Sequence, residues 1–262
     1  MTHEIPAVMP PLRPASAYAR NLRPAAAFDW LAAGWRDLTA QPASSLAYGL
    51  GVFVVSAVIV GGLVRFGWDY ILFPAFAGFM VVGPLLAIGL YEKSRRLASG
   101  QPVTLGEMIF VHPKSGGQIL FTGVLLCVLV LLWMRAAVII YALFFGLLPF
   151  PGLNHIVPML FTTPVGWALL VVGTVVGALF ASFSFAISAF SIPMLLEEHI
   201  DCLTAMGTSM RLVWNNLPVM LAWGAIVLAL FLLSLATGML GLIVVFPLLG
   251  HGTWHAYRAI RS

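Results

Sequence analysis

The stretch Gly34–Pro42 has the sequence GWRDLTAQP, and the apolar run Ser45–Val64 begins three residues after it. The stretch combines a few charged or polar residues with a proline, and the run has the length of one membrane crossing, about 20 residues. The same order recurs at Glu107–Pro113 and Met210–Pro218. It predicts three helical hairpins in a membrane, because each time a second apolar run follows. These second runs contain Pro84, Pro193 and Pro247.

The composition is that of a membrane protein. Hydrophobic residues make up 61% of the 262-residue chain, and charged residues make up 8%. Soluble domains contain about 25% charged residues, so a water-soluble protein is excluded. The formal net charge of +4 is small, and no basic patch interleaved with aromatic residues occurs. We therefore expect an all-α, polytopic membrane protein in a lipid bilayer, with no nucleic-acid partner.

Six apolar runs are long enough to cross the bilayer as helices, each close to the required 20 residues or longer. The third is unbroken until Pro149, which is longer than one crossing needs. Prolines then predict a loop without a regular helix as far as Pro164. The predicted spans are Ser45–Val64, Ile71–Leu90, a span beginning near Gly117, Gly166–Leu196, Pro218–Leu235 and Gly238–Trp254.

The basic residues predict the orientation of these spans. Of the 13 lysines and arginines, all but Arg65 and Arg135 precede span one, follow span six, or lie in the loops after spans two and four. Basic residues are enriched in cytoplasmic loops, so both termini are expected in the cytoplasm. Residues 1–27 are expected to form a largely disordered cytoplasmic tail, and residues 28–262 a single six-span membrane domain.

Each hairpin is preceded by a segment typical of a helix at the membrane surface, with its apolar residues on one helical face. A surface helix and a hairpin together form one repeat unit, and the proline in its second span predicts a kink there. Since every unit starts and ends on the cytoplasmic side, the repeats are parallel. They predict a pseudo-threefold axis along the membrane normal. The units cover about residues 28–98, 99–199 and 200–262.

Three motifs in the chain resemble those of a known family. They are GWRDL followed by SLAYGL at Gly34–Leu50, GPLLAIGLYEKSRRL at Gly83–Leu97 and PLLGHGTWHAYR at Pro247–Arg258. Together they are similar to a bacterial family of predicted integral membrane proteins of unknown function. Some members of that family carry the label of a cytochrome c oxidase subunit. The resemblance covers nearly the whole chain from about residue 25. It implies an inner-membrane protein, and it supplies no catalytic residues.

The oxidase label finds no support in the histidines. A haem–copper centre needs several histidine ligands within the membrane helices. Here the histidines lie in the tail, in loops or at the ends of spans, so a catalytic oxidase subunit is not expected. An accessory role beside such an enzyme stays open. The histidines are His3, His112, His155, His199, His251 and His255.

Two of these histidines are candidate ligands. His251 and His255 are four residues apart, so they share a helix face and could bind a metal or a haem. Further donors would be needed, and Glu198 or His199 at the same level could supply them. The alternative is that both histidines bind headgroups or neighbouring loops through hydrogen bonds.

Charged residues at the ends of spans form a second group of candidates. Arg135 lies in the third apolar run, close to the far side of the membrane, where it could serve as an anchor paired with Asp69. A charge within the membrane could instead have a function. Glu197 and Glu198 belong to an acidic cluster at the cytoplasmic end of span four. They are expected to form ion pairs across loops or, alternatively, to make a docking surface.

These features favour a non-enzymatic protein without a cofactor. We expect a scaffold, assembly or accessory subunit that packs against other membrane proteins, those of respiratory complexes among them, or against lipids. One alternative is a transporter or channel for a small solute. A second is a metal- or haem-binding accessory protein that uses His251 and His255.

Overall fold

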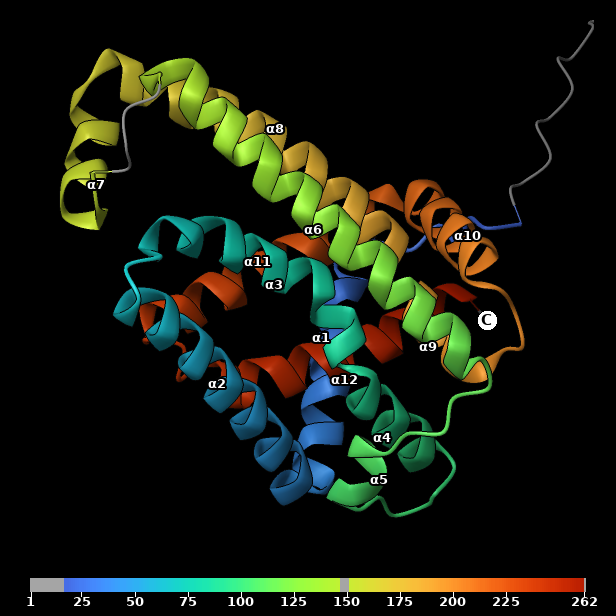
Figure 1. The fold of residues 1–262 in the computed structure, drawn as a ribbon. Coiled ribbons are helices and arrows are strands. Elements are labelled where there is room, and N and C mark those ends of the chain that lie inside the picture. The colour runs from blue at the N-terminus through green and yellow to red at the C-terminus, as the bar shows by residue number, and fades with distance from the viewer. Residues whose placement is uncertain (1–16, 147–150, 262) are drawn as a thin grey trace, which may run out of the picture.

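A computed structural model describes residues 17–146 and 151–261, and within them every regular element is a helix (Figure 1). The predicted all-α class is confirmed. The elements are α1 (Ala26–Ala40), α2 (Pro42–Arg65), the 3-10 helix η1 (Asp69–Ile71), α3 (Leu72–Leu86), α4 (Ile88–Ala98), α5 (Leu105–Ile109), α6 (Gly116–Phe145), α7 (Leu153–Thr162), α8 (Pro164–Ser188), α9 (Ser191–Glu197), α10 (Cys202–Asn215), α11 (Leu217–Ala236) and α12 (Leu242–Arg261).

Five segments in the described part of the chain are long and apolar enough to cross a membrane. They are α2, η1 through α4, α6, α8 with α9, and α11, and they correspond to the first five predicted spans. The sixth predicted span, Gly238–Trp254, overlaps α12, which is not among the five. The first nine residues of α12 are uncharged and mostly apolar, but the remainder contains His251, His255, Arg258 and Arg261. By length and composition, the described residues therefore contain five candidate membrane spans, compared with the six predicted from the sequence.

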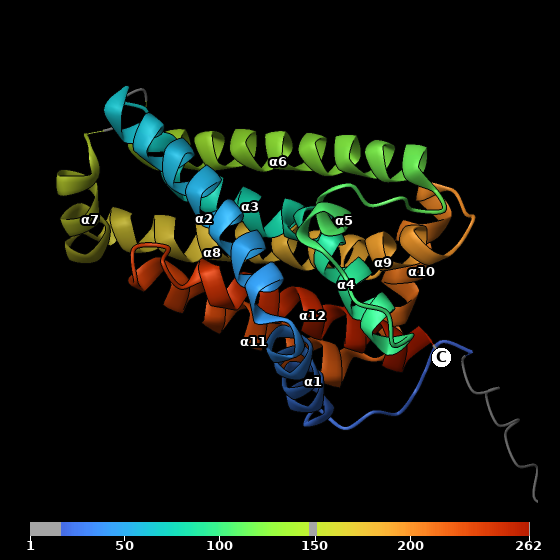
Figure 2. The same ribbon diagram turned by 90° about the horizontal axis from the view of Figure 1, so that it is seen from below.

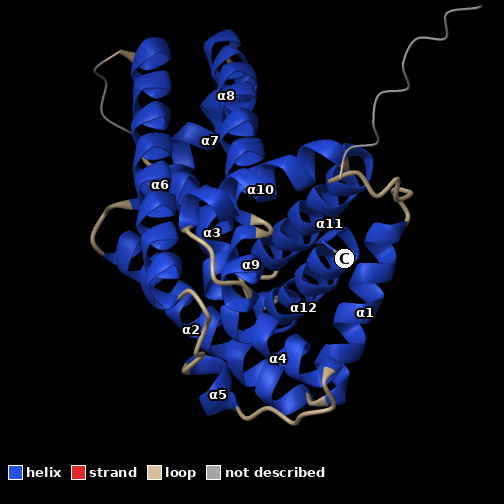
Figure 3. Ribbon diagram, turned by 90° about the vertical axis from the view of Figure 1, so that its right-hand side faces the viewer, coloured by secondary structure: helices blue, strands red, loops and turns tan. Residues whose placement is uncertain are grey.

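The third and fourth spans form an arm. α6 and α8 lie side by side and project beyond the other helices (Figure 3). α6 has 30 residues, about 45 Å at 1.5 Å per residue, so the overlong apolar run is one continuous helix. The predicted absence of a regular helix before Pro164 is wrong, because α7 lies in that stretch and contains Pro158. A proline removes only one backbone donor, and α7 continues through it.

The buried core lies at the end of the molecule opposite α7, among α1, α4, α9, α10 and α12 (Figure 2). We call this part the base. Trp30 of α1 and Trp223 of α11 meet there edge to face, with ring centroids 5.9 Å apart. The long helices are mostly exposed: only 6% of the apolar window of α2 and 11% of that of α8 is buried. The molecule is therefore a packed base from which apolar helices extend.

Part of the predicted tail contacts the base. Residues 1–16 lie outside the described residues. The side-chain amide of Asn216, between α10 and α11, donates a 2.7 Å hydrogen bond to the Tyr18 carbonyl. Its oxygen accepts one of 2.9 Å from the Arg20 backbone N–H. The chain just before α1 is thereby fixed to the start of α11.

Glycines allow the closest helix crossings of the base. A Cβ atom on Gly34 of α1 would lie 2.6 Å from the Gly252 nitrogen and 2.7 Å from the Leu248 oxygen of α12. A Cβ atom on Gly49 of α2 would lie even closer to the Ile243 carbonyl of α12. That carbonyl has no helical donor, because residue 247 is a proline. Both α1 and α2 therefore pack directly on the backbone of α12.

The three aligned prolines have different effects. The second span of the first unit breaks between α3 and α4, shortly after Pro84. The second unit breaks between α8 and α9, where the Ala189 carbonyl lacks the donor that Pro193 cannot provide. α12 runs through Pro247 without a break. Two of the predicted kinks are thus helix breaks, and the third helix is continuous.

Candidate functional site

Polar side chains from three helices converge inside the base. Ser45 lies in the first turn of α2, Lys93 and Ser94 lie on α4, and His251 lies on α12. All four side chains are buried, and Lys93 and His251 have no exposed surface at all. Buried polar groups are stable only when they are hydrogen-bonded, so the partners of this group define the site.

The four side chains form one hydrogen-bonded series. The Lys93 Nζ donates to Ser45 Oγ at 2.7 Å and to the Gln41 carbonyl at 2.6 Å. Ser45 Oγ lies 2.9 Å from Nε2 of His251. Nδ1 of the same imidazole lies 2.8 Å from Ser94 Oγ. Ser94 also lies near the Asp37 carboxylate of α1 and helps to lower its pKa. We call this series the buried hydrogen-bond chain.

The direction of proton donation along the buried hydrogen-bond chain follows from the groups at its two ends. An ammonium group only donates and a carboxylate only accepts. Ser45 therefore accepts from Lys93 and donates its proton to Nε2 of His251. The proton of the imidazole must then be on Nδ1, from which it is donated to Ser94. Every member is satisfied when His251 is neutral, and Lys93 and Asp37 are linked as a relayed ion pair.

His255, the second candidate histidine, contacts Asp37 at the acidic end of the buried hydrogen-bond chain. Nε2 of His255 lies 2.8 Å from Oδ2 of Asp37. Burial alone would raise the pKa of Asp37, but hydrogen bonds from His255 and Ser94 outweigh it and hold the pKa below its usual value. Asp37 therefore stays ionised. The buried hydrogen-bond chain thus ends in a group that only accepts, as its direction requires.

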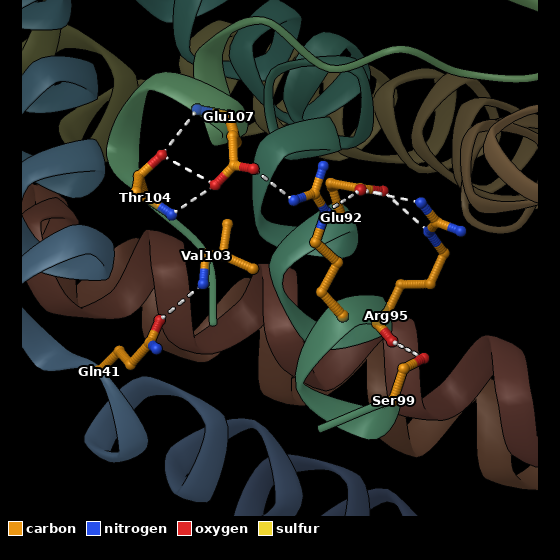
Figure 4. Close-up of polar contacts among 8 residues, drawn as sticks. Gln41, Glu92, Arg95, Ser99, Val103, Thr104 and Glu107 are labelled. Atoms are coloured by element: carbon orange, nitrogen blue, oxygen red, sulfur yellow. Dashed lines mark hydrogen bonds and ion pairs between the residues drawn. The ribbon is translucent and has the colours of Figure 1, made fainter. Parts of the chain in front are cut away.

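A second polar cluster fixes α5 against α4 (Figure 4). Glu92 accepts hydrogen bonds from Arg95 and Arg96, and Arg96 also reaches Glu107 at 2.6 Å. Thr104 and Glu107 form a capping box at the start of α5. The backbone N–H of Thr104 and the Arg96 guanidinium lower the pKa of Glu107 to about 2. The charges of this cluster are therefore paired with one another.

The acidic residues of span four form the expected ion pairs across loops. Glu197 lies 3.4 Å from Arg258, and Glu198 lies 3.0 Å from Arg261, so both join α9 and its C-cap to the end of α12. Asp201, in the same cluster, accepts a hydrogen bond from the Thr204 backbone N–H and caps α10. These contacts hold the base together.

The structure does not bring the remaining predicted residues to a common site. His251 and His255 have different partners, a pair of serines and Asp37. Among the described residues, no group of three or more His, Cys, Asp or Glu side chains could hold a metal. Arg135 is exposed on α6, and no ion pair joins it to Asp69 within the described ranges.

The sequence analysis did not single out Ser45, Lys93 and Ser94. One signal was present: Leu86, Leu90, Lys93 and Leu97 are spaced three or four residues apart, so Lys93 lies in an otherwise apolar stripe. A lysine there implies a buried partner. Ser45 and Lys93 resemble a serine nucleophile with its base, but Ser45 has no exposed surface for a substrate to reach. The arrangement therefore joins helices and does not form an open catalytic site.

Comparison with known proteins places the chain among membrane proteins. Residues 72–197 match the model of a family described as "Predicted integral membrane protein (DUF2189)". The match begins at the first residue of α3 and ends with α9, so it includes Lys93 and Ser94. No curated protein and no solved structure matches the chain.

Proposed function

The chain belongs to the DUF2189 family of integral membrane proteins of unknown function, and from this premise we propose that it is a non-enzymatic scaffold or accessory subunit. Its long helices would pack against other membrane proteins, while the base fixes their relative positions. The observation that carries the proposal is the contrast in burial between the packed base and the exposed long helices.

The base supports this role because its polar groups are used for joining helices. The buried hydrogen-bond chain connects α1, α2, α4 and α12, and the ion pairs of Glu197 and Glu198 add α9. Partly satisfied buried networks are unstable, whereas complete ones make a structure rigid and unique. A rigid base with apolar helices suits a scaffold.

The cavities do not favour transport of a polar solute. One cavity lies between α2, α3 and α11, and another lies between α3, α8, α11 and α12. Apolar side chains form most of both walls. A path for a polar solute through the membrane would need polar groups along its length, so the scaffold is the better supported function.

We further propose six spans in three parallel units, with both termini in the cytoplasm of a bacterial inner membrane. The order of helices in the first and third units supports this topology, since a short helix, a long span and a proline-containing helix follow one another as α1, α2, α3 and as α10, α11, α12, whereas α7 lies between the two spans of the second unit. Exposed aromatics support two membrane interfaces: Trp68 and Trp167 at one end, Trp35 and Trp214 at the other. Accessibility of single cysteines placed at residues 67 and 262 tests the orientation.

The scaffold proposal is tested by purification in a mild detergent. We expect a partner to co-purify in a fixed ratio. Leu179 and Val175 are exposed on α8, so Leu179→Ala with Val175→Phe changes the shape of that face and preserves its apolar character. This variant should lose the partner yet insert normally. Isolation of the native protein as a folded monomer without a partner would contradict the proposal.

A further inference from the structure

A cavity of about 190 Å³ lies between α3, α8, α11 and α12, next to the base. Its wall is rich in aromatic rings. Phe79 of α3 and Phe231 of α11 stack with centroids 5.6 Å apart and an interplanar angle of 11°, and Phe246 of α12 lies 5.9 Å from Phe79. No charged side chain of the described residues lines this space. Such a wall suits an uncharged ligand with a ring.

Three polar groups of the same wall lack a partner. Tyr91 and Ser188 line the cavity and are only 1% and 2% exposed. Neither hydroxyl makes a hydrogen bond within the part of the chain that the structure describes. The indole N–H of Trp133, a third wall residue, is buried and has no partner there either. Among the described residues, the Trp133 N–H is the buried side-chain polar atom that lacks a partner; such donors are rare and costly, and all three groups border one space.

The donors indicate the chemistry of the missing partner. An indole N–H can only donate, and hydroxyls donate readily, so the partner must offer acceptor oxygens. The volume is slightly larger than the roughly 150 Å³ cavity that accommodates benzene. We propose that this cavity binds an uncharged, membrane-soluble molecule with one ring that carries carbonyl oxygens, as in a quinone headgroup. The ring contacts the phenylalanines, and the oxygens accept from Tyr91, Ser188 and Trp133.

Water alone or a lipid chain fits the wall less well. A buried water usually makes about three hydrogen bonds, so water would satisfy the three polar groups but would leave the phenylalanine part of the wall without an apolar partner. An acyl chain would fill the volume but would leave all three donors unpartnered. The proposed ligand satisfies the apolar and the polar parts of the wall together. This binding site is independent of the scaffold role, which concerns the outer faces of the long helices.

Two probes that differ only in their oxygens test the proposal. Duroquinone and durene share a methylated six-membered ring, and only duroquinone has carbonyls. Calorimetric titration of the full chain in lipid nanodiscs, with empty nanodiscs as the blank, should give saturable binding of duroquinone at one site. Hydrogen bonds to two or three donors should make it at least roughly tenfold tighter than durene. Equal affinities, or no saturable binding by the folded protein, would overturn the proposal.

Variants locate the site. Tyr91→Phe combined with Ser188→Ala removes two donors and keeps the shape of the wall, so affinity for duroquinone should fall roughly tenfold while that for durene stays constant. Tyr70→Phe removes an exposed tyrosine hydroxyl elsewhere and should change neither affinity. Ala181→Phe fills the cavity, in which Ala181 is a wall residue, and should abolish binding of both probes. Unchanged duroquinone binding in the folded double variant, or in folded Ala181→Phe protein, would place the probe elsewhere and refute the site.

Discussion

Lys93 of α4 donates a 2.7 Å hydrogen bond to Ser45 of α2, and neither side chain has any exposed surface. A lysine ammonium group carries a large desolvation cost when it is buried, several kcal/mol even after relaxation. The Gln41 carbonyl offsets part of this cost at 2.6 Å. The opposite charge is on Asp37, reached through Ser45, His251 and Ser94. The stability of the base thus depends on two charges that do not touch.

The linkage between these charges can be measured by a double-mutant cycle. Asp37→Asn leaves Lys93 charged and buried without its counter-ion, and should lower the free energy of unfolding by about 2–4 kcal/mol. This is somewhat less than for a fully buried pair, because the Asp37 side chain is 17% exposed. Adding Lys93→Met to the Asp37→Asn protein should restore most of the lost free energy of unfolding. Unfolding in SDS, followed by circular dichroism, provides the measurement.

Asp29→Asn is the matched control, because Asp29 is an exposed carboxylate on the same helix. It should change the free energy of unfolding by less than about 0.5 kcal/mol. Additive effects of Asp37→Asn and Lys93→Met would show that the two charges are not coupled.

The tautomer of His251 is a second prediction. The direction of the buried hydrogen-bond chain places the proton on Nδ1 and leaves Nε2 as the acceptor from Ser45. Nitrogen-15 NMR of labelled histidine, with His251→Asn used to assign the signal, distinguishes the two nitrogens. A proton on Nε2 would reverse the direction of the chain and contradict the relay from Lys93 to Asp37.

The spans were predictable because an apolar run in a membrane protein has few structural alternatives. α2 and α11 begin and end within three residues of the predicted Ser45–Val64 and Pro218–Leu235. α12 was less predictable, because a half-apolar helix can cross a membrane or lie in the base. The partners of His251 could not be predicted, because they come from residues more than 150 positions away. Helical spacing shows that two histidines share a face but does not show what that face meets.

Gly34 provides a third prediction. Gly34→Ala should destabilise the protein by roughly 2–4 kcal/mol, because the new methyl group meets backbone atoms of α12 that cannot move aside. Gly51→Ala on α2 is the control, since a Cβ atom there would meet nothing within 4 Å. That change should stabilise the helix by up to about 1 kcal/mol. Equal effects of the two substitutions would mean that α1 does not pack against α12 in this way.

Glu107 provides a prediction for acid conditions. Its pKa is lowered from an ordinary 4.5 to about 2. Above pH 4.5 the carboxylate is charged in both the folded and the unfolded chain, so its contribution to stability is fully present. As the pH falls from 4.5 towards 2, the unfolded chain binds a proton and the folded chain does not, and the contribution is progressively lost.

The difference in unfolding free energy between the native protein and Glu107→Gln should therefore be constant above pH 5 and shrink between pH 4.5 and 2. Carbon-13 NMR of the Glu107 carboxyl group should give a midpoint near pH 2, because Thr104 and Arg96 stabilise the charged form. Arg96→Gln should move that midpoint upward, since it removes one of the two main partners. A midpoint near 4.5 in the native protein would show that α5 is not fixed to α4 by these hydrogen bonds.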